Sequence, residues 1–172
     1  MLKERTIMIF PNFNNMKIID GIRNKYDPLA NKIKPHITLV FPFESEISND
    51  EILRCLEIAL RDIGPFKLKL SGFSKIKDKL GNYIFLNVTE GKDEIVKLHK
   101  LLYSGILEKF KTDYPYVPHM TVGKLQTKDE LELVYDIVKK YKDIFEMVVD
   151  TVSVEVIGIN EESKIEIEYK LY

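Results

Sequence analysis

The amino-acid sequence contains the same short phrase twice, and each copy carries one of its three histidines. The first copy is Pro35-His36-Ile37-Thr38-Leu39 and the second is Pro118-His119-Met120-Thr121-Val122. Imidazole titrates near neutral pH, so one histidine can accept a proton while the other donates one. Two imidazoles together with two hydroxyls suit general acid–base chemistry on a tetrahedral phosphate, which offers several acceptor oxygens.

Each phrase has the pattern of the start of a β-strand. Proline lacks an N–H, so within a sheet it is confined to the first residue or to an edge. Side chains at i and i+2 of a strand share a face, so His36 and Thr38 should point the same way, about 7 Å apart at Cα. The alternate apolar residues should point into a core. If the two strands lie side by side, their polar faces form a four-cornered cradle for a phosphate.

Strand and helix signals follow the same order in both halves of the chain: strand, helix, Pro-His strand, helix, β-rich run. The second helix of each half opens on a capping box, Ser48-Asn49-Asp50-Glu51 or Thr127-Lys128-Asp129-Glu130. The histidines stand 83 positions apart and the capping residues 79. This order predicts an internal duplication, with repeats of approximately 1–80 and 81–172 inside one domain spanning 1–172.

The expected fold is therefore α+β and bilobal, with two antiparallel β-sheets related by a pseudo-two-fold axis. Helices should pack outside the sheets, and the histidine strands should face a central groove, a favoured location for binding sites. The apolar spacing also predicts one long helix from Asp93 to Leu107. A continuous β-rich run is expected from Phe145 to Ile159.

The composition is that of an ordinary globular protein, with 31% charged residues and a formal net charge of −1. Proteins that grip long nucleic acid usually carry a basic excess, so no long duplex is expected as a partner. A nucleic-acid substrate would be a short piece or an end. The sequence has no glycine-rich phosphate loop and no Gly-x-Ser-x-Gly elbow.

Cysteine content and hydropathy limit which other classes of protein the chain could belong to. The one cysteine, Cys55, excludes an internal disulfide and a cysteine cluster for zinc, and helical spacing predicts it to be a buried, inert thiol. The apolar run near the N-terminus is too short for a signal peptide, and no long apolar stretch follows. We expect a cytoplasmic protein with no membrane partner.

Two His-x-Thr phrases at equivalent places in a duplicated chain resemble the two-histidine (2H) phosphoesterases. This superfamily includes the 2′-5′ RNA ligase-like proteins and the cyclic nucleotide phosphodiesterases. The resemblance covers the whole chain in layout, and its specificity depends on His36-Ile37-Thr38-Leu39 and His119-Met120-Thr121-Val122. It implies a monomeric phosphoesterase, with neither metal nor other cofactor, that acts on a 2′,3′-cyclic phosphodiester or a 2′-5′ linkage of nucleotides or RNA ends.

The resemblance also implies roles for single residues. His36 and His119 would be catalytic, and Thr38 and Thr121 would bind the phosphate. Many relatives carry an arginine shortly after the second motif threonine, where this chain has Lys124. Lysine is a point charge rather than a bidentate fork, so Lys124 is a candidate for substrate binding but not for clamping the phosphate as arginine would.

Two aromatic residues near the motifs, Tyr116 and Phe41, are further candidates for substrate binding because a base can stack on them. Core packing is the alternative for both. His99 lacks a following threonine and lies in a helical stretch, which predicts a surface or helix-packing residue.

Two other functions use the same residues. The cradle could hold an RNA end or a phosphorylated metabolite without converting it, which would make the protein a binding module. Alternatively, the motifs could stabilise strands with no phosphate involved.

Overall fold

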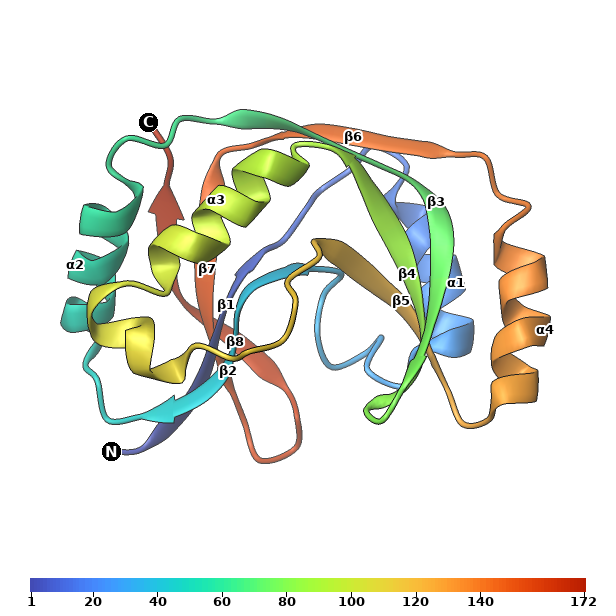
Figure 1. Ribbon diagram of the computed structural model, residues 1–172, viewed down its shortest axis with the longest axis horizontal. Coiled ribbons are helices and arrows are strands. Elements are labelled where there is room, and N and C mark those ends of the chain that lie inside the picture. The colour runs from blue at the N-terminus through green and yellow to red at the C-terminus, as the bar shows by residue number, and fades with distance from the viewer.

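Two four-stranded antiparallel sheets form the centre of the protein, which the computed structural model describes over residues 1–172 (Figure 1). The elements in chain order are β1 (Lys3–Ile9), α1 (Met16–Tyr26), β2 (Ile37–Ser45), α2 (Asn49–Leu60), β3 (Phe66–Asp78), β4 (Gly81–Glu90), α3 (Lys92–Leu102), the 3₁₀ helix η1 (Gly105–Phe110), β5 (His119–Leu125), α4 (Lys128–Val138), β6 (Ile144–Val149), β7 (Thr151–Ile157) and β8 (Ser163–Lys170). The α+β class and the two antiparallel sheets are thus confirmed.

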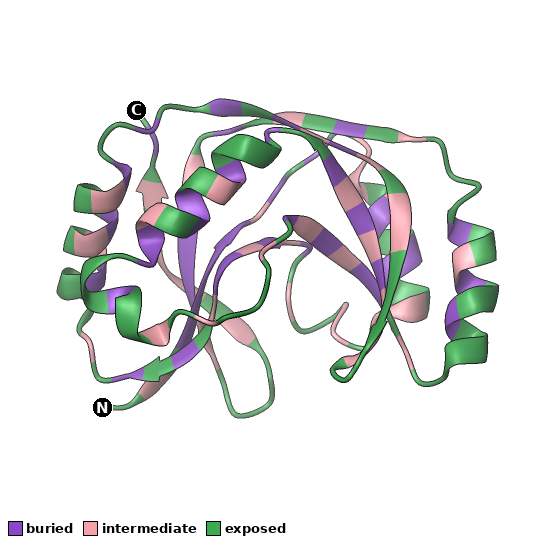
Figure 2. Cartoon of the chain, in the orientation of Figure 1, coloured by how far each residue is buried: buried purple, intermediate pink, exposed green.

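The first sheet has the strand order β2-β1-β7-β8 and the second sheet has the order β5-β4-β3-β6. Helices α2 and α3 lie against the first sheet, and α1 and α4 lie against the second. The helices present buried faces to the sheets and exposed faces to solvent (Figure 2). None of them has both the length and the apolar character needed to cross a membrane.

The two sheets do not coincide with the two halves of the sequence. The order strand, helix, strand, helix, strand occurs as β1-α1-β2-α2-β3 and again as β4-α3-β5-α4-β6, and residue 80 lies in the turn between them. However, β3 and β4 pair as a hairpin across that turn, so both belong to the second sheet. The first sheet combines the first two strands with the last two. The lobes are therefore interleaved, and each sheet takes strands from both halves.

Two expected elements are each interrupted. The long helix ends at Leu102 because Gly105 adopts a left-handed φ of 58°, and the chain continues as η1. The C-terminal β-rich run is broken at Asp150, where β6 of the second sheet passes into β7 of the first. In Figure 1 this crossing runs along the top of the molecule. Cys55 on α2 is half-buried rather than fully buried, and burial raises the pKa of its thiol.

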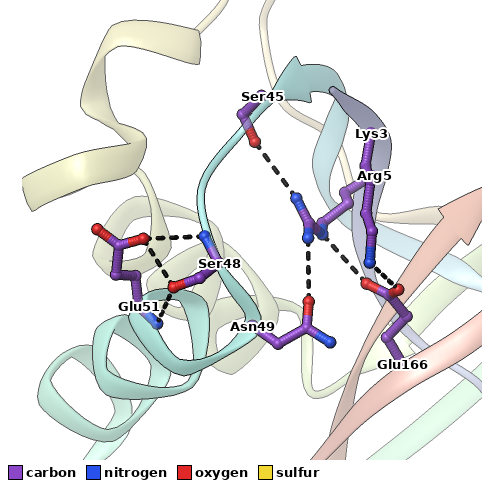
Figure 3. Close-up of polar contacts among 7 residues, drawn as sticks. All are labelled: Lys3, Arg5, Ser45, Ser48, Asn49, Glu51 and Glu166. Carbon is purple, nitrogen blue, oxygen red and sulfur yellow. Dashed lines mark hydrogen bonds and ion pairs between the residues drawn. The ribbon is translucent and has the colours of Figure 1, made fainter. Parts of the chain in front are cut away.

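A buried cation anchors α2 to the first sheet. Arg5 of β1 is 1% exposed and donates from Nε to Glu166 Oε2 on β8 at 3.2 Å (Figure 3). Its Nη2 donates to Asn49 Oδ1 at the start of α2 at 3.0 Å. These contacts satisfy a charge that would otherwise be costly to bury.

Both predicted capping boxes are present. In α2 the Glu51 N–H donates to Ser48 Oγ at 3.3 Å, and the Ser48 N–H donates to Glu51 Oε2 at 2.9 Å (Figure 3). Thr127 and Glu130 make the same pair of contacts in α4. The sequence signature thus located the start of both helices.

We expect Ser48→Ala to lower the free energy of unfolding by about 1 kcal/mol, because it removes the acceptor for an otherwise unpaired N–H of the first helical turn. Urea unfolding followed by circular dichroism measures the change. Ser48→Asp keeps an accepting oxygen and should stay within about 0.5 kcal/mol of wild type. Equal losses in both variants would contradict the capping role.

Candidate active site

The two histidine strands occupy equivalent edges of the two sheets. β2 is the edge strand next to β1 in the first sheet, and β5 is the edge strand next to β4 in the second. His36 lies immediately before β2, and His119 is the first residue of β5. β2 and β5 contact each other near the centre of the molecule (Figure 1). Folding therefore brings together two motifs that are 83 positions apart in the sequence.

The motif side chains alternate between the core and the opposite face of the strand, as strands require. Four apolar residues are fully buried: Ile37, Leu39, Met120 and Val122. The polar residues between them are half-buried: His36, Thr38, His119 and Thr121. Each motif thus offers one imidazole and one hydroxyl on the face opposite its core residues.

The two imidazoles are oriented by the same local hydrogen bond. His36 Nδ1 lies 2.8 Å from the Lys34 carbonyl oxygen, and His119 Nδ1 lies 2.7 Å from the Val117 carbonyl oxygen. A carbonyl oxygen can only accept, so Nδ1 carries the proton in both rings. In the neutral tautomer the lone pair is then on Nε2, which is the atom left to react in both histidines.

The functional atoms of the four motif side chains make no hydrogen bonds within the protein. The two bonds just described are the only ones that these imidazoles form, so both Nε2 atoms are unengaged. Neither motif hydroxyl is bonded to the protein, in contrast to Thr6 of β1, whose Oγ1 donates to the Val40 carbonyl oxygen at 2.8 Å. Two imidazole nitrogens and two hydroxyls therefore remain available to a ligand.

Burial lowers the pKa of both motif histidines below the ordinary imidazole value, and the carbonyl bond at Nδ1 partly opposes this in each ring. For His36 the positive charge of Arg23 lowers the pKa further, Asp27 raises it, and His119 lowers it. A positive charge on His119 thus disfavours protonation of His36, which suits a pair made of one base and one acid.

Two aromatic rings that the sequence did not single out contact the histidines. Phe85 of β4 stacks on His119, with ring centroids 3.6 Å apart and planes inclined by 22°. Phe10, which follows β1, meets His36 edge-on at 6.2 Å. Phe85 thus lies in the strand next to β5, and Phe10 lies directly after the strand next to β2. Stacking covers a ring face and leaves the nitrogens at the ring edge accessible.

A β-bulge turns Lys124 toward the motif face. Thr121 stands opposite Phe85, but Gly123 stands opposite Ile84 and Lys124 opposite Tyr83, so the register skips one residue of β5. Phe85 and Tyr83 are two apart and share a face of β4, so Thr121 and Lys124 also share a face. The Lys124 ammonium lies 5.7 Å from the centre of the Tyr83 ring.

Phe41 occupies the position on β2 that Lys124 occupies on β5, because each stands five residues after its motif histidine. Here the register skips Leu39, because Thr38 stands opposite Met8 and Val40 opposite Ile7. Phe41 therefore returns to the face of Thr38. Its half-buried ring meets the rings of His99 and Tyr116 edge-on, with centroids 6.4 Å away in each case.

The Tyr116 side chain is engaged by other parts of the protein rather than free to bind a substrate. Its hydroxyl donates to the Thr38 carbonyl oxygen at 2.6 Å, and one face of its ring stacks on His99 at 3.7 Å. His99 is 9% exposed and bonds the Leu39 carbonyl oxygen, so it is a helix-packing residue.

A buried ion pair organises the loop that delivers His36. Arg23 of α1 donates from Nε to Asp27 Oδ2 at 2.8 Å and from Nη1 to the Ile33 carbonyl oxygen at 2.9 Å. The Asp27 carboxylate also accepts from the Leu29 N–H at 2.9 Å. These contacts fix the segment between α1 and β2.

A hollow of about 480 Å³ lies next to His36, bounded by Lys34 and Pro35. Its walls also include Phe10, Asp20, Lys32 and Lys164, of which Lys32 is paired with Glu161. Its volume is in the range of small-molecule sites. Nowhere does the protein group three or more His, Cys, Asp or Glu side chains in a way that could hold a metal ion.

Sequence comparison connects the chain to known proteins. The model of the 2′-5′ RNA ligase superfamily matches residues 11–158. A protein of Bacillus licheniformis, provisionally named a phosphoesterase, is 35% identical over 147 residues, which is 84% of each chain. A Bacillus pumilus protein with the same provisional name is 32% identical over 145 residues, covering 84% of this chain and 83% of its own.

Structure comparison finds the same fold in LigT of Escherichia coli. The LigT crystal structure with 3′-AMP superposes with a TM-score of 0.68 at 14% identity and covers 99% of both chains. The LigT structure in apo form gives a TM-score of 0.64 at 15% identity, over 99% of this chain and 98% of LigT. The fold, the repeated motif and the family match agree, and this chain belongs to the 2′-5′ RNA ligase superfamily of two-histidine phosphoesterases.

Proposed function

We propose that this protein hydrolyses a 2′,3′-cyclic phosphodiester at a nucleotide or an RNA end by metal-independent acid–base catalysis. The observation that carries the proposal is the matched pair of imidazoles. His36 and His119 lie at the starts of two edge strands that contact each other. Both imidazoles bond a carbonyl oxygen through Nδ1 and keep Nε2 unengaged. Such a pair can serve one phosphorus centre from two sides.

In the proposed reaction, Nε2 of the neutral histidine takes a proton from water as the water oxygen attacks phosphorus. The bond from phosphorus to one ribose oxygen breaks, and that oxygen takes the proton from Nε2 of the other, protonated histidine. The product is a nucleoside monophosphate. The two histidines end with exchanged protonation states, and exchange with solvent restores them. With a ribose 5′-hydroxyl in place of water as the nucleophile, the same displacement would form a 2′-5′ linkage. The reverse of that step, with the roles of the two histidines exchanged, would cleave the linkage and restore the cyclic phosphate.

The motif hydroxyls and Lys124 complete the proposed site. Thr38 and Thr121 would donate to the non-bridging phosphate oxygens and stabilise the charge that grows in the transition state. Lys124, on the face of Thr121, would attract the anionic substrate. Phe41 would contact the base, and the hollow bounded by Lys34 and Pro35 would accept the nucleoside or the next phosphate of an RNA chain.

The comparisons support a nucleotide ligand. The LigT structures include complexes with 3′-AMP and with phosphate, and 3′-AMP is one of the two monophosphates that hydrolysis of the 2′,3′-cyclic form of AMP can give. The test is incubation of the purified protein with the four 2′,3′-cyclic nucleotides and with a short RNA bearing a cyclic end, in excess EDTA. We expect conversion to monophosphates, read by ³¹P NMR. Tight binding without conversion of any substrate would instead indicate a binding module that uses the same cradle.

We expect the pH profile of kcat/KM to be bell-shaped and to decline above an optimum on the acidic side of pH 6.5. The acid histidine must be protonated, and burial lowers its pKa, so its proton is lost at a lower pH than from a free imidazole. The bound anionic phosphate stabilises imidazolium and raises both pKa values. The alkaline limb of kcat should therefore lie at higher pH than that of kcat/KM. Coincident limbs would contradict contact between phosphate and both rings.

A further inference from the structure

The outer edge of β2 is covered by side chains rather than by another strand. Edge strands present unpaired backbone groups, which proteins usually shield. In β2 the unpaired backbone groups lie around Leu39, the residue after Thr38 that the pairing with β1 skips. The carbonyl oxygens of Thr38 and Leu39 and the N–H of Phe41 each bond a side chain from a distant part of the sequence.

Helix α3 and Tyr103, the residue directly after it, supply two of these side chains. His99 Nδ1 donates to the Leu39 carbonyl oxygen at 2.7 Å, and the Phe41 N–H donates to Tyr103 Oη at 2.9 Å. Both side chains are at least nine-tenths buried, with 9% of His99 and 5% of Tyr103 exposed. This pairing fixes β2 to α3 just beyond the first motif.

The third side chain, Tyr116, comes from the loop that leads into β5. Its hydroxyl donates to the Thr38 carbonyl oxygen at 2.6 Å, across 78 positions of sequence. Its ring lies parallel to that of His99, 3.7 Å away with planes inclined by 2°. Since Tyr116 stands three residues before His119, this hydrogen bond connects the backbone of one motif directly to the approach of the other.

We infer that Tyr116 is a positioning residue, which fixes the separation between the His36–Thr38 and His119–Thr121 half-sites. His99 holds the Tyr116 ring in place through the stack. Burial raises the pKa of the Tyr116 phenol, so the hydroxyl keeps its proton and remains a donor throughout the working pH range. The inference rests on the proposed function only where activity is the readout.

A positioning role differs measurably from a substrate contact. The Tyr116 hydroxyl is already committed to Thr38, and one ring face is already covered by His99. Its loss should let the two half-sites shift against each other. A misplacement of about 1 Å between reacting groups can lower a rate by about 10²-fold. Such a shift acts on the chemical step, so it lowers kcat more than it raises KM.

The experiment compares Tyr116→Phe with Tyr114→Phe. The first removes only the bonded hydroxyl and keeps the stacked ring, whereas Tyr114 is 65% exposed and its hydroxyl has no partner in the protein. Turnover of a 2′,3′-cyclic nucleotide, the thermal midpoint and the imidazole Cε1–H resonances of the motif histidines are measured in each. For Tyr116→Phe we expect kcat to fall about 10- to 100-fold, KM to change less than about 3-fold, and Tm to fall by about 2–4 °C. Tyr114→Phe should match wild type.

A second pair of variants tests the support for Tyr116. His99→Asn keeps a donor near the position of Nδ1, whereas His99→Ala removes both donor and stack, so Asn should recover part of the kcat that Ala loses. An unchanged kcat in Tyr116→Phe, or a rise in KM alone, would overturn the positioning role. If wild type shows no turnover, the proposed function fails while this inference is still decided by NMR. Shifted His36 and His119 resonances in Tyr116→Phe would support it, and unshifted resonances would overturn it.

Discussion

Replacing either motif histidine with glutamine is expected to lower kcat for a 2′,3′-cyclic nucleotide by about 10²- to 10⁴-fold, the usual contribution of one proton transfer. Glutamine fills much of the imidazole volume and can still bond the carbonyl that holds Nδ1, but it cannot exchange a proton near neutral pH. His36→Gln and His119→Gln should both remain folded, because both side chains are only half-buried and lie on the strand face opposite the core residues. Initial rates at saturating substrate measure the loss.

The double variant separates a joint mechanism from two independent effects. If one histidine is the base and the other the acid of a single displacement, the two act as a unit. Replacing the second histidine in a variant that already lacks the first should then lower kcat much less than the first replacement did. Lys67→Gln, on the exposed side of β3, is a control for loss of a surface charge. A single variant that keeps activity within about 3-fold of wild type would exclude the two-histidine mechanism.

The sequence could predict those features that depend on neighbouring residues. The alternation around His36 and His119 determines which side chains leave the core, and the structure buries the intervening apolar residues completely. The capping boxes at Ser48 and Thr127 located the starts of two helices, since a cap involves only four consecutive residues. The repeated order of these local signals was enough to give the two-sheet α+β class.

Features that depend on pairing between distant strands could not be predicted in this way. The interleaving of the lobes follows from the β3–β4 hairpin and from the passage of β6 into β7 at Asp150, and neither changes the local pattern. The ring of Phe85 reaches His119 only because β4 pairs with β5 in one register. Alternation in β4 marks Phe85 as facing away from the core, but it does not name the partner strand.

The bulges are the clearest example of this limit. Strict alternation from Thr121 would place Lys124 on the core side, and the register skip instead brings it to the motif face beside Tyr83. A corresponding skip in β2, at Leu39, lies where His99 and Tyr116 bond the backbone of that strand. One extra residue per strand thus decides both a candidate substrate contact and the link between the motifs.

Removing a motif hydroxyl should be the next most damaging change. Thr38→Val and Thr121→Val keep the β-branched shape that suits a strand, so the backbone and its pairing should survive. Neither hydroxyl bonds the protein, so the folded state loses no internal hydrogen bond and Tm should stay near the wild-type value. What is lost is a donor to the phosphate oxygens. Loss of one transition-state donor typically lowers kcat by about 10²- to 10³-fold.

Serine provides the matched control, because Thr→Ser at either position keeps the hydroxyl and removes only a methyl group. We expect the serine variants to stay within about 10-fold of wild type, and the valine variants to fall at least about 10-fold further. Turnover of the cyclic nucleotide and binding of the monophosphate product should be measured together. If the hydroxyls act mainly on the transition state, product affinity should fall much less than kcat. Equal losses in both would indicate that the threonines bind phosphate uniformly, and equal activity of valine and serine variants would remove the hydroxyls from the mechanism.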